Sequence, residues 1–410
     1  MTEAQATRLT KRHRSERLFR AAGVSAILLA ILFLGTLLVS ILWSGVGALQ
    51  QTRILLTVEM PATVEGSNFP GLVKKTLRAT FPDVSARRDK KQLYRLVSSG
   101  AAWEIRDHLR DNPQDAGKPV ALQVTASDDV DMLIKGKVSR NDEPDVRRLS
   151  DKQLAWLDRL QESGALELGF NSNFFSYGDS REPEVAGIAA ALAGSFFSLL
   201  ICLLLAFPLG VMAALYLEEF APRNRLTSLI EVNINNLAAV PSIVFGLLGL
   251  AIFLNFFELP RSAPLVGGMV LALMTLPTII ITGRASLKAV PPSIREAALA
   301  VGASKVQAVF HHVLPLAMPG VLTGTIIGMA RAVGETAPLL MIGMVAFVVD
   351  VPKNILEPAT ALPVQVFLWA DAPERAFEER TAATIIVLLI FLMAMNLLAV
   401  IQRRKFEVRW

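Results

Sequence analysis

Two charged residues, Arg331 and Glu335, stand inside a run of mostly apolar residues from 320 to 349. A charge inside a membrane costs at least about 2.5–3.5 kcal/mol on insertion scales, so such residues usually face protein or water and often mark a transport path. Residues four apart on a helix lie on one face and can pair. An arginine offers forked donors to an oxyanion, and a nearby glutamate would limit how long the anion is held. The alternative is a static ion pair that fixes the orientation of the helix.

Neighbouring residues extend this candidate path. The glycines at 320, 324 and 328 share the face of the charged pair, at a spacing that lets another helix approach closely, so we expect the pair to face protein. Three uncharged candidates for the substrate pathway are Thr336, Asn235 and Ser242. Asn235 belongs to a group with Asn233 and Asn236, for which lining a cavity and bonding neighbouring helices remain equally open. The helix-packing candidates are Gly320, Gly324 and Gly328.

A loop at 284–318 carries strong helix signals. Ser293 with Glu296 has the spacing of a capping box directly after two prolines, and Ser304 with Gln307 repeats that spacing. Gly302 lies between them, where it can end the first helix. We therefore predict two short capped helices joined by a glycine turn. His311 and His312 are adjacent and point in different directions on a helix, so no metal site is expected there.

The composition indicates a membrane protein. The chain has 410 residues, of which 52% are hydrophobic and 19% charged, and its mean hydropathy is +0.45. The net charge of +5 does not indicate nucleic-acid binding, because the basic residues cluster at the ends of apolar runs. The single cysteine, Cys202, excludes an intrachain disulfide and a cysteine-based metal cluster.

Six apolar runs are long enough to cross a bilayer, which needs about 20 residues. The first is preceded by a basic tail at 1–22 that should stay in the cytoplasm, and it exceeds the core of a cleaved signal peptide, which is the alternative. Six crossings return the basic tail at 405–410 to the cytoplasm, so both termini are predicted there. Pro241 and Pro277 are expected to kink their spans. The predicted spans are 23–43, 185–217, 226–256, 265–282, 320–349 and 382–401.

Residues 50–184 have the composition of a soluble domain, and the topology places them outside the cytoplasm. Residues 54–58 and 120–125 are rich in β-formers, and Ser150 with Gln153 caps an amphipathic helix that ends at Gly164. An α+β fold is predicted for this inserted domain. The aromatic candidates for its core are Trp103, Tyr94 and Trp156.

The loop residues resemble a known signature. Glu296, Ala297 and Ala298, followed by Gly302 and then Leu314 with Pro315, resemble the EAA motif of permease subunits of bacterial ATP-binding-cassette (ABC) importers. In those importers this helix pair docks into a groove on the ATPase. The segment Arg331-Ala-Val-Gly-Glu-Thr-Ala-Pro resembles the PstA-type phosphate permeases, and so do the segments that begin at Val240, Leu276 and Ala289. The resemblance covers about 186–404 and omits the domain at 50–184.

The resemblance implies an all-α polytopic membrane protein with a type I permease core at 185–404. It implies import of inorganic phosphate across the bacterial cytoplasmic (inner) membrane by alternating access. The expected partners are an ATPase dimer, a second similar permease, an extracytoplasmic phosphate-binding protein and lipid. ATP and magnesium would bind the ATPase, because this chain lacks the phosphate-cradling Gly-x4-Gly-Lys-Ser/Thr loop and is not expected to be an enzyme or to hold a cofactor. The alternatives are another oxyanion such as molybdate or sulfate, a membrane receptor, and an integral membrane enzyme.

Overall fold

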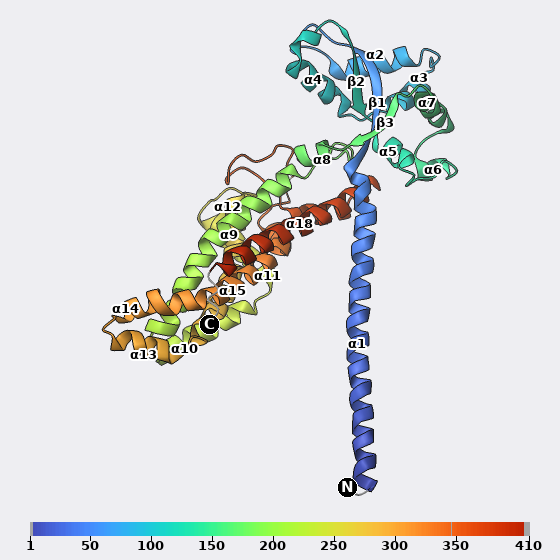
Figure 1. Cartoon of the computed structure of the whole chain (residues 1–410). Helices are drawn as coiled ribbons and strands as arrows, with labels where there is room; N and C mark the ends of the chain where they lie inside the picture. The colour runs from blue at the N-terminus through green and yellow to red at the C-terminus, as the bar shows by residue number, and fades with distance from the viewer. Residues whose placement is uncertain (1–2, 346, 406–410) are drawn as a thin grey trace.

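The chain forms a bundle of apolar helices with a small α+β domain at one end (Figure 1). This computed structural model describes residues 3–345 and 347–405. Among the described residues, five helices are long and apolar enough to cross a membrane, and a bent pair forms a sixth span if it is counted as one. The predicted fold class, a polytopic helical membrane protein with an inserted α+β domain, is confirmed.

The membrane part is built from the following elements: α1 (Glu3–Val46), α9 (Ala189–Leu215), η3 (Tyr216–Phe220), α10 (Arg225–Ala238), α11 (Ser242–Gly249), η4 (Leu250–Phe256), α12 (Pro264–Lys288), α13 (Pro292–Ala300), α14 (Lys305–Ala308), η5 (Val309–Val313), α15 (Leu314–Gly334), α16 (Ala337–Met341), α17 (Leu362–Ala370) and α18 (Ala376–Arg404). Helices α9 and α12 form the most extensive helix pair. Between them and α15 lies a continuous apolar core that includes Leu271, Ile279 and Ala332.

The domain follows α1 through a short 3₁₀ turn, η1 (Gly47–Leu49). Its elements are β1 (Gln50–Glu59), α2 (Phe69–Thr80), α3 (Arg87–Tyr94), α4 (Ala101–Asp111), η2 (Pro113–Asp115), β2 (Pro119–Thr125), α5 (Asp128–Ile134), α6 (Pro144–Arg147), α7 (Asp151–Glu162), β3 (Leu166–Phe170) and α8 (Asn173–Ser176). The sheet is antiparallel with the order β2-β1-β3, and Ile54 of the central strand pairs with Val124 and Leu166. Strand alternation buries Ile54, Leu56 and Val58 beneath the helices.

Several predictions for the domain are confirmed. Both predicted strands lie within β1 and β2, and the capping box of Ser150 opens α7. The chain leaves that helix through Gly164, whose φ is +68°. Strand β3 was missed, and the placement of Trp103 in the core was wrong. Its side chain is 54% exposed, because α4 buries Ala102, Ile105 and Leu109 on its other face.

The first helix is longer than predicted and stands apart from the bundle (Figure 1). It is continuous over Glu3–Val46, so the described part of the basic tail is helical and continues the span predicted at 23–43. The apolar window of this helix is not buried anywhere along its length. It packs at its carboxyl-terminal end, where Gly45 lies against Ile386 and Ala383 of α18.

The span predicted at 226–256 is not straight. Helices α10 and α11 meet at an angle of 102°. Pro241 lies at the break, where it lacks the N–H that a continuous helix requires. Pro277, in contrast, lies within α12, which is unbroken.

The spans predicted at 320–349 and 382–401 have the wrong limits. Helix α15 begins at Leu314 and ends at Gly334, because Glu335 adopts an extended backbone and a new short helix follows it. Helix α18 begins at Ala376, six residues before the predicted start. The carboxyl-terminal tail from residue 406 onwards lies outside the described residues.

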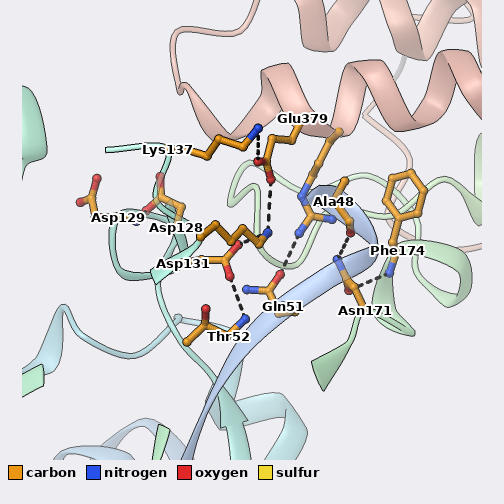
Figure 2. Close-up of polar contacts among 12 residues, drawn as sticks. Ala48, Gln51, Thr52, Asp128, Asp129, Asp131, Lys137, Asn171, Phe174 and Glu379 are labelled. Carbon is orange, nitrogen blue, oxygen red and sulfur yellow. Dashed lines mark hydrogen bonds and ion pairs between the residues drawn. The ribbon is translucent and has the colours of Figure 1, made fainter. Parts of the chain in front are cut away.

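A buried charge network fastens the domain to the amino-terminal end of α18 (Figure 2). The Nη1 atom of Arg380 donates to the Ala186 carbonyl at 2.6 Å, and its Nη2 atom donates to Gln51 at 3.1 Å. Glu379 pairs with Lys135 of the domain at 3.2 Å. Because these charges are almost fully removed from water, their mutual pairing decides whether the junction is stable.

Glu184 is a carboxyl group at the same junction, just before α9. It is 3% exposed, and its Oε2 atom has no hydrogen-bond partner. Burial raises the pKa of Glu184 to about 7, and the carboxylates of Asp128 and Glu182 add to this shift, while the hydroxyl of Ser98 opposes it. Burial, together with the charge of Asp128, also raises the pKa of Asp129 to about 6.

The junction is therefore expected to weaken as the pH rises. The folded chain binds protons on Glu184 that the unfolded chain releases from about pH 4.5, so this stabilisation is present below pH 4.5 and is lost as the pH passes 7. The shift corresponds to about 3 kcal/mol at most. Thermal unfolding in detergent should show a lower Tm at pH 8 than at pH 5. Glu184→Gln should flatten this dependence, and the exposed control Glu162→Gln should leave it unchanged. An equally steep dependence in Glu184→Gln would contradict this origin.

A row of glycines joins α15 to α12. A Cβ atom added at Gly328 would lie 2.7 Å from Thr275, and one added at Gly320 or Gly324 would overlap Ser286 or Thr282. Only glycine lets the two backbones approach this closely.

Gly324→Ala is therefore expected to destabilise the chain by about 1–3 kcal/mol, because the added methyl group overlaps the Thr282 side chain. The measurement is unfolding of the purified chain in detergent. In a Thr282→Gly chain, the further change Gly324→Ala should cost much less than it does in the wild-type chain, since Thr282→Gly removes the side-chain atoms that clash, Cβ included. Gly35→Ala in α1, where nothing lies within 4 Å, is the matched control. An equal cost of Gly324→Ala in both chains would rule out this contact as its cause.

Candidate functional site

Two short helices form the candidate coupling site, at the end of the bundle opposite the domain (Figure 1). Helix α13 ends in a tight reversal, in which Gly302 has a φ of +90° and the Ala303 N–H donates to the Ala298 carbonyl at 3.1 Å. The predicted capping box of Ser304 with Gln307 opens α14. The turn and the second cap are thus confirmed.

The first predicted cap is wrong. Helix α13 begins at Pro292 with Pro291 in the cap position, and no side chain caps it. Ser293 therefore lies inside the first turn, because proline already supplies the φ that a first helical residue needs. Glu296 is left free of a capping role.

The exposed surface of the loop is partly apolar. Glu296 and Ala297 are exposed, whereas Ala298 is buried beneath them. Gly302 and Pro315 are exposed and Leu314 is half-buried. Large apolar side chains are also at least half exposed nearby, namely Leu299, Val301 and Val306. A surface of this kind at the end of a polytopic chain is typical of a protein contact.

The inner side of the loop is fixed by packing. Val309 and Val313 of η5 are buried against Leu215 of α9 and Leu287 of α12. Ile294 of α13 packs against the same apolar cluster. The two helices are therefore seated on the bundle rather than suspended in solvent.

The charged pair lies at the end of α15. Arg331 Nε donates to Glu335 Oε1 at 3.3 Å. Glu335 follows the last helical residue instead of lying within the helix. Arg331 is half exposed, so the expectation that both charges face protein is wrong for this chain alone. Ala332, next to the half-exposed Arg331, is buried.

Only some of the other pathway candidates lie on neighbouring elements. Thr336 directly precedes α16, and Ser242 begins α11, which packs against α16 where Gly246 meets Pro338. Asn235 is exposed on α10. Within the described part of the chain, no hydrogen bond joins Asn235 or Ser242 to the charged pair. His311 and His312 are exposed, and no group of three or more potential metal ligands converges among the described residues.

The sequence reasoning missed the acidic end of α9. Glu218 and Glu219 lie in the π-turn η3 and bind arginines of α12 and α13. Adjacent carboxylates at the end of an apolar run were the available signal. Their partners are Arg284 and Arg295.

Two family models match the chain. Residues 206–409 match "binding-protein-dependent transport system inner membrane component". Residues 6–143 match a domain of unknown function, DUF3333. The first match covers the helical core from within α9 onwards, including the loop at 284–318, and the second covers α1 and most of the inserted domain.

Known proteins are similar to about half of this chain. The phosphate transport system permease protein PstA 1 of Mycobacterium tuberculosis (strain CDC 1551 / Oshkosh) is 32% identical over 54% of this chain and 72% of its own length. PstA of Yersinia pestis is 32% identical over 52% of this chain and 71% of its own length. A structure of the inward-facing MetNI methionine ABC transporter aligns with 54% of this chain and 95% of that chain, at 18% identity and a TM-score of 0.42. The chain belongs to the PstA family of phosphate transport system permease proteins, among the inner membrane components of binding-protein-dependent transport systems.

Proposed function

We propose that this chain is a permease subunit that moves inorganic phosphate into the cytoplasm, driven by a separate ATPase. The observation that carries the proposal is the exposed helix pair α13 and α14, which is seated on the bundle and presents Glu296 beside apolar side chains. A transporter whose motor is a separate subunit needs a stiff contact of this kind. ATP binding would close the ATPases, and the helix pair would pass that motion to the bundle, which alternates between two openings.

The charged end of α15 supports an anion as cargo. The two Nη groups of Arg331 make no hydrogen bond within the described residues, and the side chain is half exposed. A planar guanidinium with free donors suits a tetrahedral oxyanion. The family relatives are named for phosphate, which decides between oxyanions of similar shape.

The partners follow from the same proposal. An ATPase pair would bind the coupling helices in the cytoplasm, and a second, similar permease would complete the pathway. An extracytoplasmic phosphate-binding protein would deliver the anion on the side of the inserted domain. Both termini would then lie in the cytoplasm, as the basic residues at the ends of the chain favour.

The ATPase contact can be tested by photo-crosslinking. A photoreactive amino acid at Val301, which is 86% exposed, should crosslink to the ATPase in membranes that contain the complete importer. The same group at Trp103 on the inserted domain is the matched control and should not reach the ATPase. Crosslinking from Trp103 alone, or from neither position, would contradict the proposed orientation of the chain.

The role of Arg331 can be tested by uptake of radioactive phosphate. Arg331→Ala should lower uptake at least tenfold while the ATPase still copurifies, because the cationic site for the anion is lost. Arg331→Lys should fall between this variant and the wild type, since it keeps the charge without the fork. Arg261→Ala, at an exposed cation outside the site, is the control. Uptake at the wild-type rate in Arg331→Ala would leave a static ion pair as the explanation for the charged pair. Inhibition of wild-type phosphate uptake by excess sulfate or molybdate would favour another oxyanion as the substrate.

A further inference from the structure

Cationic side chains from three different elements contact the turn that follows α9, beside the coupling helices. The turn η3 ends in three consecutive residues, and each contacts a different neighbour. The contacts are Glu218 with Arg284 of α12 at 3.4 Å, Glu219 with Arg295 of α13 at 2.6 Å, and the Phe220 ring with Lys305 of α14 at 5.4 Å from its centroid. Both coupling helices thus touch the last two residues of this turn.

Arg295 makes the most extensive of these contacts. Its Nε atom donates to Glu219 Oε1 at 3.0 Å, and Nη2 donates to the same oxygen at 2.6 Å. Its Nη1 and Nη2 atoms also donate to the carbonyls of Val290 and Leu287, each at 2.8 Å. The Leu287 carbonyl lies in the last turn of α12, and the Val290 carbonyl lies just beyond the end of that helix. One guanidinium therefore ties α13, α12 and α9 together.

Burial makes this contact stiff. The Glu219 side chain is 8% exposed and that of Arg295 is 24% exposed. An ion pair with two donors from one guanidinium and little water is fixed in direction as well as distance. Loss of either partner would strand the other charge in the same apolar surroundings.

The covalent path of the chain leaves α9 without a direct backbone link to the coupling loop. Helix α14 runs through η5 directly into α15, and α12 leads into α13 after a short connection, so a push on the loop reaches α15 and α12 along the backbone. Helix α9 is far from the loop in sequence. Its links to α13 and α14 are side-chain contacts, namely the charged ones above and the apolar cluster around Leu215 and Val313, and they add to its packing against α12.

We propose that Glu219 and Arg295 are positioning residues that transmit the movement of the coupling helices to α9. The inference rests on the proposed function, in which a partner ATPase drives the chain. In each cycle Arg295 carries the displacement of α13 to Glu219. Helices α9 and α12, which pack along most of their length and share the same arginine, then move as one unit.

The first test measures phosphate transported per ATP hydrolysed in proteoliposomes that contain the complete importer. Arg295→Glu and Glu219→Arg should each lower this ratio at least tenfold while ATP hydrolysis continues, because like charges then face each other. The double variant Arg295→Glu with Glu219→Arg should exceed either single variant at least threefold. Arg223→Glu, at an exposed cation just beyond the same turn, is the control. Should the charge reversals prevent assembly, the milder Arg295→Lys and Glu219→Gln should still lower the ratio about threefold.

A second measurement needs no transported anion and so separates this inference from the choice of substrate. Spin labels at Leu209→Cys on α9 and Ile390→Cys on α18, in a Cys202→Ala chain, report the position of α9 in the assembled complex. ATP should change their distance in the otherwise unaltered chain, and Arg295→Lys should at least halve that change. The inference would be overturned if ATP changed the distance in Arg295→Lys and Glu219→Gln as much as in the otherwise unaltered chain. It would also be overturned if the double charge reversal transported no more phosphate per ATP than the single reversals. If the chain with Arg295 and Glu219 intact showed the expected distance change but no phosphate uptake, only the proposed substrate would be overturned.

Discussion

Charges removed from water must be paired, and in this chain the pairing decides which helices are joined. The apolar surfaces of membrane-spanning helices give little directional preference, because lipid is as apolar as a neighbouring helix. A buried guanidinium does give direction. Arg380 binds the Ala186 carbonyl just before α9, and Arg295 binds Glu219 at the other end of that helix. Helix α9 is thereby held at both ends by an arginine from a different part of the chain.

The same pairing fixes the inserted domain to the bundle. Glu379 of α18 pairs with Lys135 of the domain, and α1 packs against α18 beside that junction (Figure 2). Arg380 also binds the Ala186 carbonyl just before α9, so the domain, the start of α18 and the start of α9 meet at one end of the bundle. The loop at 284–318 lies at the other end. Helices α9 and α12 connect the two ends, and the glycines along α15 let that helix approach α12 closely.

The local features that could be predicted are those set by neighbours in sequence. Ser304 with Gln307, Gly302 and the proline at 241 each fix backbone hydrogen bonds within a few residues, and each acts as its spacing indicates. The prediction that Ser293 caps its helix was wrong, because α13 already begins at Pro292, and proline favours the first helical position. The predicted end of α15 was wrong as well, because the apolar composition continues past Glu335 whereas the helical backbone ends at Gly334.

The sequence by itself determined the polytopic membrane class, the apolar runs, the inserted domain and the two short helices of the loop at 284–318, because hydropathy and helix signals depend on residues close together in the chain. The tertiary structure alone decided the partners of the charges. Arg295 and Glu219 are 76 residues apart, and Arg380 and Ala186 are 194 apart. No local pattern specifies such pairs, since they depend on how whole helices pack and on the cost of leaving a charge unpaired in an apolar interior.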